Sequence, residues 1–368
     1  MLLRSNTPWL EYVRSRTLDL QRMKQRHSTP AFIYRAGIGL ADTQITCDAT
    51  GFPSDLIFLS HACALPPRGP AALFGARAGR RQIVTTEQTL RLLGDAGDKL
   101  RTRTLPAAFG RPFNLGEHRI EVVPTGFLPG AAALLCESEG RRVFYLGAFC
   151  PEPLLDGIAA GEVRHADAIC IDATFGDANL VFPPRQEAIA SVRTFVKKSL
   201  SEGRTPVLLA SPFGALPAVA LDLAQAGIAM RAHPRIVAVL ARLRGACTSI
   251  PAPTRFAGRV VSQEVLLWPP EARDASALAT LEKLDLALVS GSAAYPEAVA
   301  RLRVQQGFAL TNMPSAAEIL VAIEATGARE VALFHSGAES LAALLRTRNL
   351  DAYTLGPPRQ MLLPVDHG

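Results

Sequence analysis

The chain has 368 residues, of which 48% are hydrophobic and 20% are charged. This length and balance predict a globular protein with a sizeable core, built as two domains or as one large domain that carries an insertion. Every apolar run is shorter than the roughly 18 residues that a membrane-spanning helix needs. Residues 1–30 also lack the apolar stretch of a secretory leader. We therefore expect a cytoplasmic protein that does not contact a membrane.

The net charge of +6 and the pI of about 9.2 are only mildly basic, but the positive charge is unevenly distributed. Residues 68–103 contain eight Lys or Arg against three acidic residues. Such a cluster suits the phosphate backbone of DNA or RNA, and a solvated arginine-rich surface is an equally good interpretation. The candidate nucleic-acid contacts are Arg77, Arg80, Arg81, Arg101 and Arg103.

The six cysteines are scattered along the chain, and no two of them form a CxxC pair. Several lie inside apolar runs, as Cys170 does in residues 168–172. This pattern favours free, buried thiols in a reducing compartment over a zinc finger.

The first half of the chain is β-rich after an N-terminal extension of helical character, in which Trp9, Leu10 and Val13 lie among basic residues. Residues 55–60 form a short continuous apolar run, which is typical of a strand buried on both faces. Residues 131–136 and 142–146 flank a Glu-Ser-Glu-Gly turn and predict a hairpin. The remaining elements expected in this half are strands 82–85 and 119–123 and a helix over 86–93.

From residue 166 onward the pattern changes to strand–helix alternation. Residues 185–200 carry Ile189, Val192 and Val196 at helical spacing. A β-rich half followed by such units predicts a mixed α/β protein, with two sheets sandwiched between helices and a doubly wound α/β cassette. The expected strands are 168–172, 206–210, 228–231, 284–290, 330–334 and 351–355, and the further helices are 216–226, 235–243, 316–325 and 339–347. Residues 245–273 are Pro-rich and loop-like, interrupted by residues 259–267.

Five short loops follow buried strands, where strand ends can bring side chains to one common site. A single histidine in such a loop is more often a hydrogen-bonded loop residue than a metal ligand, so the order of the loops carries the information. The loops are residues 59–63, 124–130, 145–149, 172–177 and 333–337.

This series resembles the β-CASP branch of the metallo-β-lactamase superfamily over about residues 36–358. Within that branch it is most similar to the bacterial ligase-associated DNA exonucleases, which are related to the exonuclease-like enzymes that process mRNA 3′ ends. The resemblance implies an αββα sandwich with an inserted α/β cassette. The implied segments are an N-terminal extension (1–30), the first part of the metallo-β-lactamase-like domain (31–183), the β-CASP cassette (184–306) and the last part of that domain (307–368).

The metal-ligand motifs of that family are degenerate here. Two metal ions would need about five histidines and two or three carboxylates to activate a water and clamp a phosphate. Of the matching positions, only His61 and His335 keep a nitrogen donor, and Cys63 is the one replacement able to coordinate zinc. The vestigial positions implied by the resemblance are His61, Cys63, Phe127, Ala148, Asp172, Met313 and His335.

We therefore expect no catalytic residues, no metal and no cofactor, and a former metal cavity that is filled by core packing. Asp172 and His335 are expected to hydrogen-bond neighbouring loop backbone. Thr86 and Thr89 are expected to cap a helix rather than to bind phosphate. A helix start after residues 212–217 could receive a phosphate, but these residues supply little polar side chain.

Three functions remain open on the sequence alone. The first is a pseudoenzyme: an inactive nuclease homologue that binds DNA or RNA, or acts as a scaffold, in DNA repair or processing with a ligase, helicase or active nuclease partner. The second is a residual or rebuilt metal-dependent exonuclease or hydrolase. The third is a pure protein-interaction module that docks through its N-terminal extension.

Overall fold

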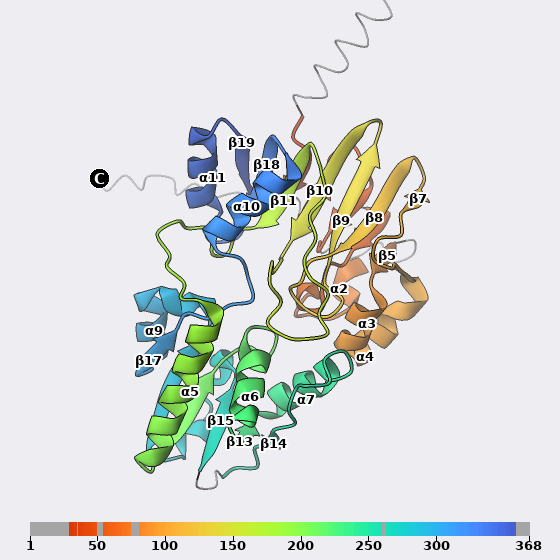
Figure 1. Cartoon of the computed structure of the whole chain (residues 1–368). Helices are drawn as coiled ribbons and strands as arrows, with labels where there is room; N and C mark the ends of the chain where they lie inside the picture. Colours follow the sequence, from red (N-terminus) through yellow and green to blue (C-terminus); the bar gives the residue numbers. More distant parts are fainter. Residues whose placement is uncertain (1–28, 35, 50–53, 75–80, 260–262, 358–368) are drawn as a thin grey trace, which may run out of the picture.

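The computed structural model describes residues 29–34, 36–49, 54–74, 81–259 and 263–357 (Figure 1). Almost all of the N-terminal extension, together with Arg77 and Arg80, lies outside the described residues. The described part contains three sheets and helices on their outer faces, which confirms the expectation of a mixed α/β protein. No helix within the described ranges is both long enough and apolar enough to cross a membrane.

The first sheet joins an antiparallel meander, β1-β2-β3, to three strands that continue in parallel. The early strands are only three residues long, and no periodic pattern singles them out individually. The strands are β1 (Phe32–Tyr34), β2 (Ile38–Leu40), β3 (Ile45–Cys47), β4 (Leu56–Phe58), β5 (Gln82–Thr85) and β6 (Thr104–Pro106).

The second sheet has the order β19-β18-β11-β10-β9-β8-β7. The expected hairpin is present, because β9 and β10 pair in antiparallel register from Ser138 opposite Arg141. Strands β10, β11, β18 and β19 then run parallel. The strands are β7 (Phe113–Leu115), β8 (His118–Pro124), β9 (Ala132–Ser138), β10 (Arg141–Gly147), β11 (Ala168–Asp172), β18 (Glu330–Phe334) and β19 (Asp351–Leu355).

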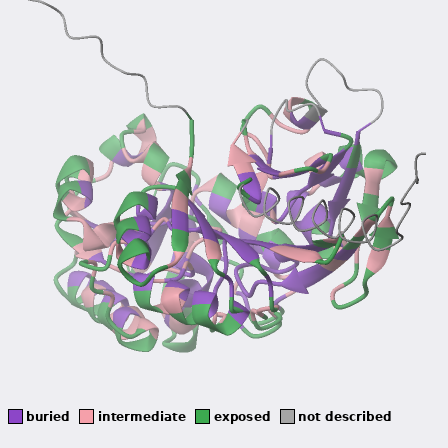
Figure 2. Ribbon diagram, turned by 90° about the horizontal axis from the view of Figure 1, so that it is seen from above, coloured by how far each residue is buried: buried purple, intermediate pink, exposed green. Residues whose placement is uncertain are grey.

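These two sheets pack face to face, and each carries helices on its other side. Alternate residues of a strand face opposite layers, so Phe58 points into the core between the sheets whereas Ile57 points to the helices outside. The resulting order of layers is helix, sheet, sheet, helix, and Figure 2 shows the buried residues concentrated along the strands. The outer helices are α2 (Ala71–Phe74), α3 (Glu87–Leu93) and α4 (Asp95–Leu100) on one side and α10 (Ala316–Thr326) and α11 (Ala338–Thr347) on the other.

The third sheet is entirely parallel, with the order β14-β13-β15-β12-β16-β17. Helices α5, α6 and α7 cover one face, and the short helices α8 and α9 cover the other. The strands are β12 (Thr205–Leu209), β13 (Ala229–Ala232), β14 (Thr254–Arg255), β15 (Glu264–Trp268), β16 (Leu284–Val289) and β17 (Gln306–Phe308). The helices are α5 (Arg185–Ser201), α6 (Leu216–Gln225), α7 (Pro234–Leu243), α8 (Ser276–Ala279) and α9 (Pro296–Leu302).

The third sheet interrupts the second. Strand β11 leaves the second sheet before the third sheet forms, and β18 returns directly beside β11, with Ala168 opposite Glu330. Residues 185–308, which begin with α5, therefore form a separate α/β unit inserted between two neighbouring strands. One buried core cluster nevertheless joins the units, because Leu90 of α3 and Leu240 of α7 belong to it together.

Candidate functional site

Strand ends bring polar side chains to the same edge of the sandwich. Asp172 ends β11 and His335 directly follows β18, and these two strands are parallel neighbours. The Nδ1 atom of His335 lies 2.9 Å from Oδ2 of Asp172. His335 adopts a left-handed backbone conformation, with φ of 72°, so the surrounding loop holds it in a conformation that non-glycine residues rarely adopt.

Asp172 is a structural anchor for this edge. The residue is 6% exposed, and its Oδ1 atom accepts hydrogen bonds from the backbone N–H of Thr174 at 2.9 Å and from the Thr174 hydroxyl at 2.6 Å. This confirms the expected bond from Asp172 to loop backbone, whereas His335 bonds the Asp172 carboxylate instead. The hydrogen bond to Asp172 raises the pKa of His335 above its usual value.

His61 belongs to a second hydrogen-bonded group, centred on Asp48. The Asp48 carboxylate accepts the backbone N–H of Ser60 at 2.8 Å, the Ser60 hydroxyl at 2.5 Å and the Tyr145 hydroxyl at 2.8 Å. Because the single Ser60 hydroxyl proton goes to Asp48, Nδ1–H of His61 donates to Ser60 Oγ, 2.6 Å away. Burial lowers the pKa of His61, which favours the neutral ring, and a neutral ring with its hydrogen on Nδ1 can make this bond.

Asp48 and Tyr145 belong to the site although no sequence motif marks them as site residues. Asp48 directly follows β3 and has a φ of 51°, and its hydrogen bond with Tyr145 joins residues 97 positions apart. A pairing over that separation leaves no local pattern. Tyr145 does lie in one of the five loops singled out from the sequence, so its position near the site could be predicted although its role could not.

An apolar cluster lies next to the His61 ring. Phe127, Leu128, Ala131 and Ala148 are all buried there and pack together with Phe213 and Met313. The Phe127 ring meets the His61 ring edge-on, with 5.0 Å between the ring centroids. Three of the vestigial positions named from the sequence (Phe127, Ala148 and Met313) therefore lie together in one cluster of carbon side chains.

Asn312 links this cluster to the inserted unit by hydrogen bonds. Its side chain is 6% exposed, and its Nδ2 atom donates to the carbonyl oxygens of Phe127, at 3.2 Å, and of Phe213, at 3.1 Å. Phe127 belongs to the loop between β8 and β9, whereas Phe213 precedes α6 of the inserted unit. A single amide therefore links the two units directly over the apolar cluster.

The pair of metal ions implied by the family resemblance does not fit these residues. Across the described ranges, no group of three or more His, Cys, Asp or Glu side chains is placed to hold a metal ion. Both Asp172 oxygens and the Nδ1 atoms of His61 and His335 are used in hydrogen bonds to the protein. Cys63 is exposed and is not part of the apolar cluster.

Thr86 caps α3 as expected, whereas the Thr89 side chain does not cap the helix and bonds a neighbouring turn instead. Thr86 Oγ1 accepts the backbone N–H of Thr89 at 3.1 Å, and both hydroxyls donate to the carbonyl oxygen of Gly130, at 2.7 and 2.9 Å. Gly130 has a φ of 78°, and a Cβ atom there would lie 2.6 Å from Thr86 Oγ1. The turn after the apolar cluster is thus fixed to the start of α3.

The candidate nucleic-acid contacts differ in their surroundings. Arg101 is exposed and paired with Glu87 at 3.0 Å and with Asp98 at 3.3 Å. Arg103 is exposed next to it. Arg81 is only 6% exposed and donates to the Leu73 carbonyl oxygen at 3.2 Å, so its guanidinium is engaged inside the protein instead of lying on the surface.

Comparisons with known proteins place this architecture among proteins with related folds. The sequence matches no known family model. It is 25% identical over 329 residues to a probable DNA ligase from Opitutus terrae, and the alignment covers 85% of this chain but only 30% of that relative. The chain therefore spans less than a third of the length of the curated relative that it matches.

A solved structure shares the fold at low sequence identity. It is the crystal structure of a protein of unknown function from Enterococcus faecalis V583, with a TM-score of 0.53 and 12% identity. The similarity covers 83% of this chain and 79% of the other. At this identity the likeness concerns the fold alone.

Proposed function

We propose that this chain is a β-CASP-type protein of metallo-β-lactamase fold that has lost its metal centre and serves as a non-catalytic subunit in DNA processing. The order of the layers and the unit inserted between β11 and β18 support the fold assignment. The three strand-end loops that carry His61, Asp172 and His335 support the β-CASP assignment.

One observation carries the loss of catalysis: the apolar cluster of Phe127, Ala148 and Met313 at positions where the family motifs carry ligands. Hydrolysis of a phosphodiester needs an activated water and a stabilised phosphorane-like transition state, which metal ions supply when carboxylates and imidazoles hold them. Carbon side chains can do neither. Filling the cavity with them also avoids the cost of burying charged ligands without a metal ion.

The relative described as a probable DNA ligase supports a role beside a ligase. A region similar to this chain accounts for 30% of that protein, so most of its length lies outside the match. We infer that this chain acts as a nucleic-acid-binding or scaffold component, with a ligase as its first candidate partner and a helicase or an active nuclease as the alternatives.

A nuclease assay tests the catalytic part of the proposal. Purified protein is incubated with end-labelled single-stranded DNA, duplex DNA and RNA in separate reactions with magnesium, manganese and zinc. We expect wild type and His335→Ala to give the same background, because no metal centre exists for the substitution to destroy. Cleavage by wild type that His335→Ala abolishes would contradict the proposal and favour a rebuilt hydrolase.

A further inference from the structure

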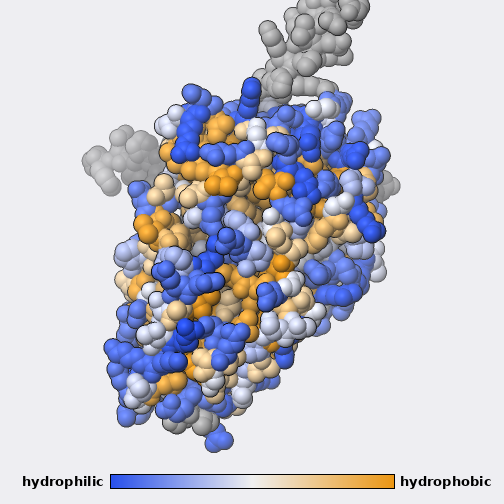
Figure 3. Space-filling model, in the orientation of Figure 1, coloured by the Kyte–Doolittle hydropathy of each residue, from blue (hydrophilic) through white to orange (hydrophobic). Residues whose placement is uncertain are grey.

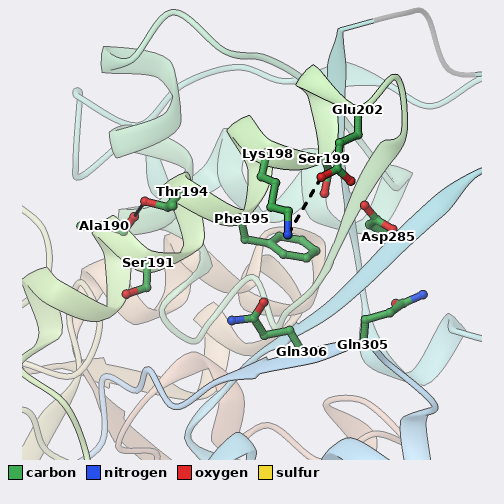
Figure 4. Close-up of a pocket in the computed structure, with 10 residues that line it drawn as sticks. All are labelled: Ala190, Ser191, Thr194, Phe195, Lys198, Ser199, Glu202, Asp285, Gln305 and Gln306. Carbon is green, nitrogen blue, oxygen red and sulfur yellow. Dashed lines mark hydrogen bonds and ion pairs between the residues drawn. The ribbon is translucent and has the colours of Figure 1, made fainter.

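A polar groove lies on the inserted unit, away from the apolar cluster, between α5 and the strand ends of β16 and β17. Its volume is about 600 Å³, which is within the usual range for small-molecule sites. One wall is a single face of α5, because its residues recur every three or four positions. Figure 4 shows these α5 side chains opposite Gln305 and Gln306.

The groove contains one aromatic ring in a fixed orientation. Phe195 is half-buried, and its ring packs edge-on against Phe308 with 5.7 Å between the ring centroids. Its helix neighbours in the groove are the small residues Ser191 and Thr194 and the longer Lys198. An aromatic ring that is held in place and faces an open polar groove suits the stacking of a flat, heteroaromatic group.

Two glutamines form the opposite wall of the groove. The Oε1 atom of Gln305 accepts the backbone N–H of Leu286 at 2.7 Å, which leaves the amide N–H groups of Gln305 as donors. Gln306 is exposed in the same wall and offers both a donor and an acceptor. Glutamine amides of this kind match the hydrogen-bonding edges of nucleobases.

The charges around the groove compensate one another. Asp285 is paired with Arg204 at 2.5 Å, and Glu202 lies 4.0 Å from Lys198. A near-neutral groove favours a neutral heteroaromatic ring over a phosphate group, which would require an excess of positive charge.

We propose that this groove binds a nucleobase of a single-stranded nucleic acid, stacked on Phe195 and recognised by the amides of Gln305 and Gln306. The inference rests on the proposed nucleic-acid-binding role and gives that role a site on the inserted unit. A nucleobase can come from a strand or from a free nucleotide, and single strands present unstacked bases that a duplex does not.

The test measures the binding of full-length wild type and variants to three labelled probes: oligo(dA), the same strand in a duplex, and adenosine monophosphate. The variants are Gln306→Ala and Phe195→Leu, of which the second removes the ring while keeping apolar packing against the core. The matched control is Gln225→Ala, an exposed glutamine on α6. Thermal melting of each variant establishes that it is folded.

We expect each groove variant to weaken oligo(dA) binding about tenfold, and Gln225→Ala to leave it unchanged. The slope of log affinity against log salt should stay the same in Gln306→Ala, since no phosphate contact is removed. Duplex binding should be unaffected by the groove variants. Wild type could instead bind adenosine monophosphate but not the strand, and both groove variants could lose that binding. This result would support base recognition in the groove and would identify the ligand as a free nucleotide.

Strand binding by wild type that neither groove variant weakens would overturn the groove assignment while leaving the nucleic-acid role intact. Failure of wild type to bind any strand at low salt would instead remove the nucleic-acid part of the proposed function. In that case only the mononucleotide probe tests the groove. If wild type does not bind adenosine monophosphate either, the groove assignment is wrong.

Discussion

His61 and His335 lie at the same edge of the sandwich, yet their surroundings shift their pKa values in opposite directions. Burial lowers the pKa of His61, and a neutral His61 ring can still donate the hydrogen bond from Nδ1 to Ser60 Oγ. The hydrogen bond to Asp172 raises the pKa of His335, whose side chain is 58% exposed. The pKa of His335 is therefore expected to lie above that of His61.

A histidine NMR titration tests this difference. The His335 signal should titrate above the ordinary histidine pKa, and the His61 signal should titrate below it. In Asp172→Asn the pKa of His335 should fall towards its ordinary value, because the carboxylate that favours the charged ring is gone. An unchanged His335 titration in Asp172→Asn would show that the pair does not form.

The same pair implies a pH-dependent contribution to stability. Because the pKa of His335 is raised in the folded state, its stabilising effect is complete below the ordinary histidine pKa and is lost as pH rises through the raised value. Urea unfolding of wild type and His335→Gln should thus differ most in mildly acidic buffer and converge in alkaline buffer. A difference that grows with pH would contradict the assigned sign.

Asn312 and Thr86 are the hydrogen-bonding groups that fix whole elements near the apolar cluster. Asn312 joins the β8–β9 loop to the loop before α6. Thr86 joins the start of α3 to the Gly130 turn. Both residues are buried, so neither bond can be replaced freely by water.

We expect Asn312→Ala to lower the free energy of unfolding by about 1–3 kcal/mol, because a buried carbonyl group and a partly buried one lose their donor. Limited proteolysis should also cleave this variant faster than wild type in the two loops that Asn312 joins. The matched control is Asn179→Ala, an exposed asparagine whose amide bonds only the nearby Asp177 and whose loss should cost less than about 0.5 kcal/mol. Equal effects of the two substitutions in urea unfolding would refute the linking role of Asn312.

Thr86→Val keeps the shape of the side chain but removes the helix cap and the bond to Gly130. Unfolding should become easier by about 1–2 kcal/mol, the usual cost of a lost N-cap. Thr347→Val, at an exposed position late in α11, is the control and should be close to neutral. If urea unfolding does not distinguish the two variants, the Thr86 hydrogen bonds do not contribute measurably to stability.

Long periodic elements could be predicted from the sequence, whereas pairings between distant parts of the chain could not. The α5 helix and the β9–β10 hairpin have clear periodicity and formed where expected. Strands β1 to β3 have three residues each, too few for a period to emerge. Asp48 joins the site only because the first sheet packs against the second, which is a tertiary event that no local pattern encodes.

Some large apolar side chains lie on the surface of the protein. Val321 of α10 is 65% exposed, and Figure 3 shows apolar residues gathered over that helix.

Arginines at 77, 80, 101 and 103 are still the candidate contacts for a phosphate backbone, since the burial of Arg81 makes it unsuitable for this role.

Salt dependence tests the role predicted for the basic cluster of residues 68–103. The affinity for single-stranded DNA should fall linearly when log affinity is plotted against log salt. The Arg77→Ala/Arg80→Ala variant should reduce that slope by about 0.7 for each phosphate that it no longer neutralises. Arg348→Ala, an exposed arginine at the end of α11, serves as the control. An unchanged slope in the double variant would remove these two arginines from the interface.

The metal content of the purified full-length protein is the sharpest test of the proposal that carbon side chains have replaced a metal centre. After incubation with zinc or manganese and exhaustive dialysis, mass spectrometry should find far less than one ion per chain, and wild type should match His61→Ala/His335→Ala. Stoichiometric metal in wild type that the double variant loses would show that a metal centre persists and that the protein is not a metal-free pseudoenzyme.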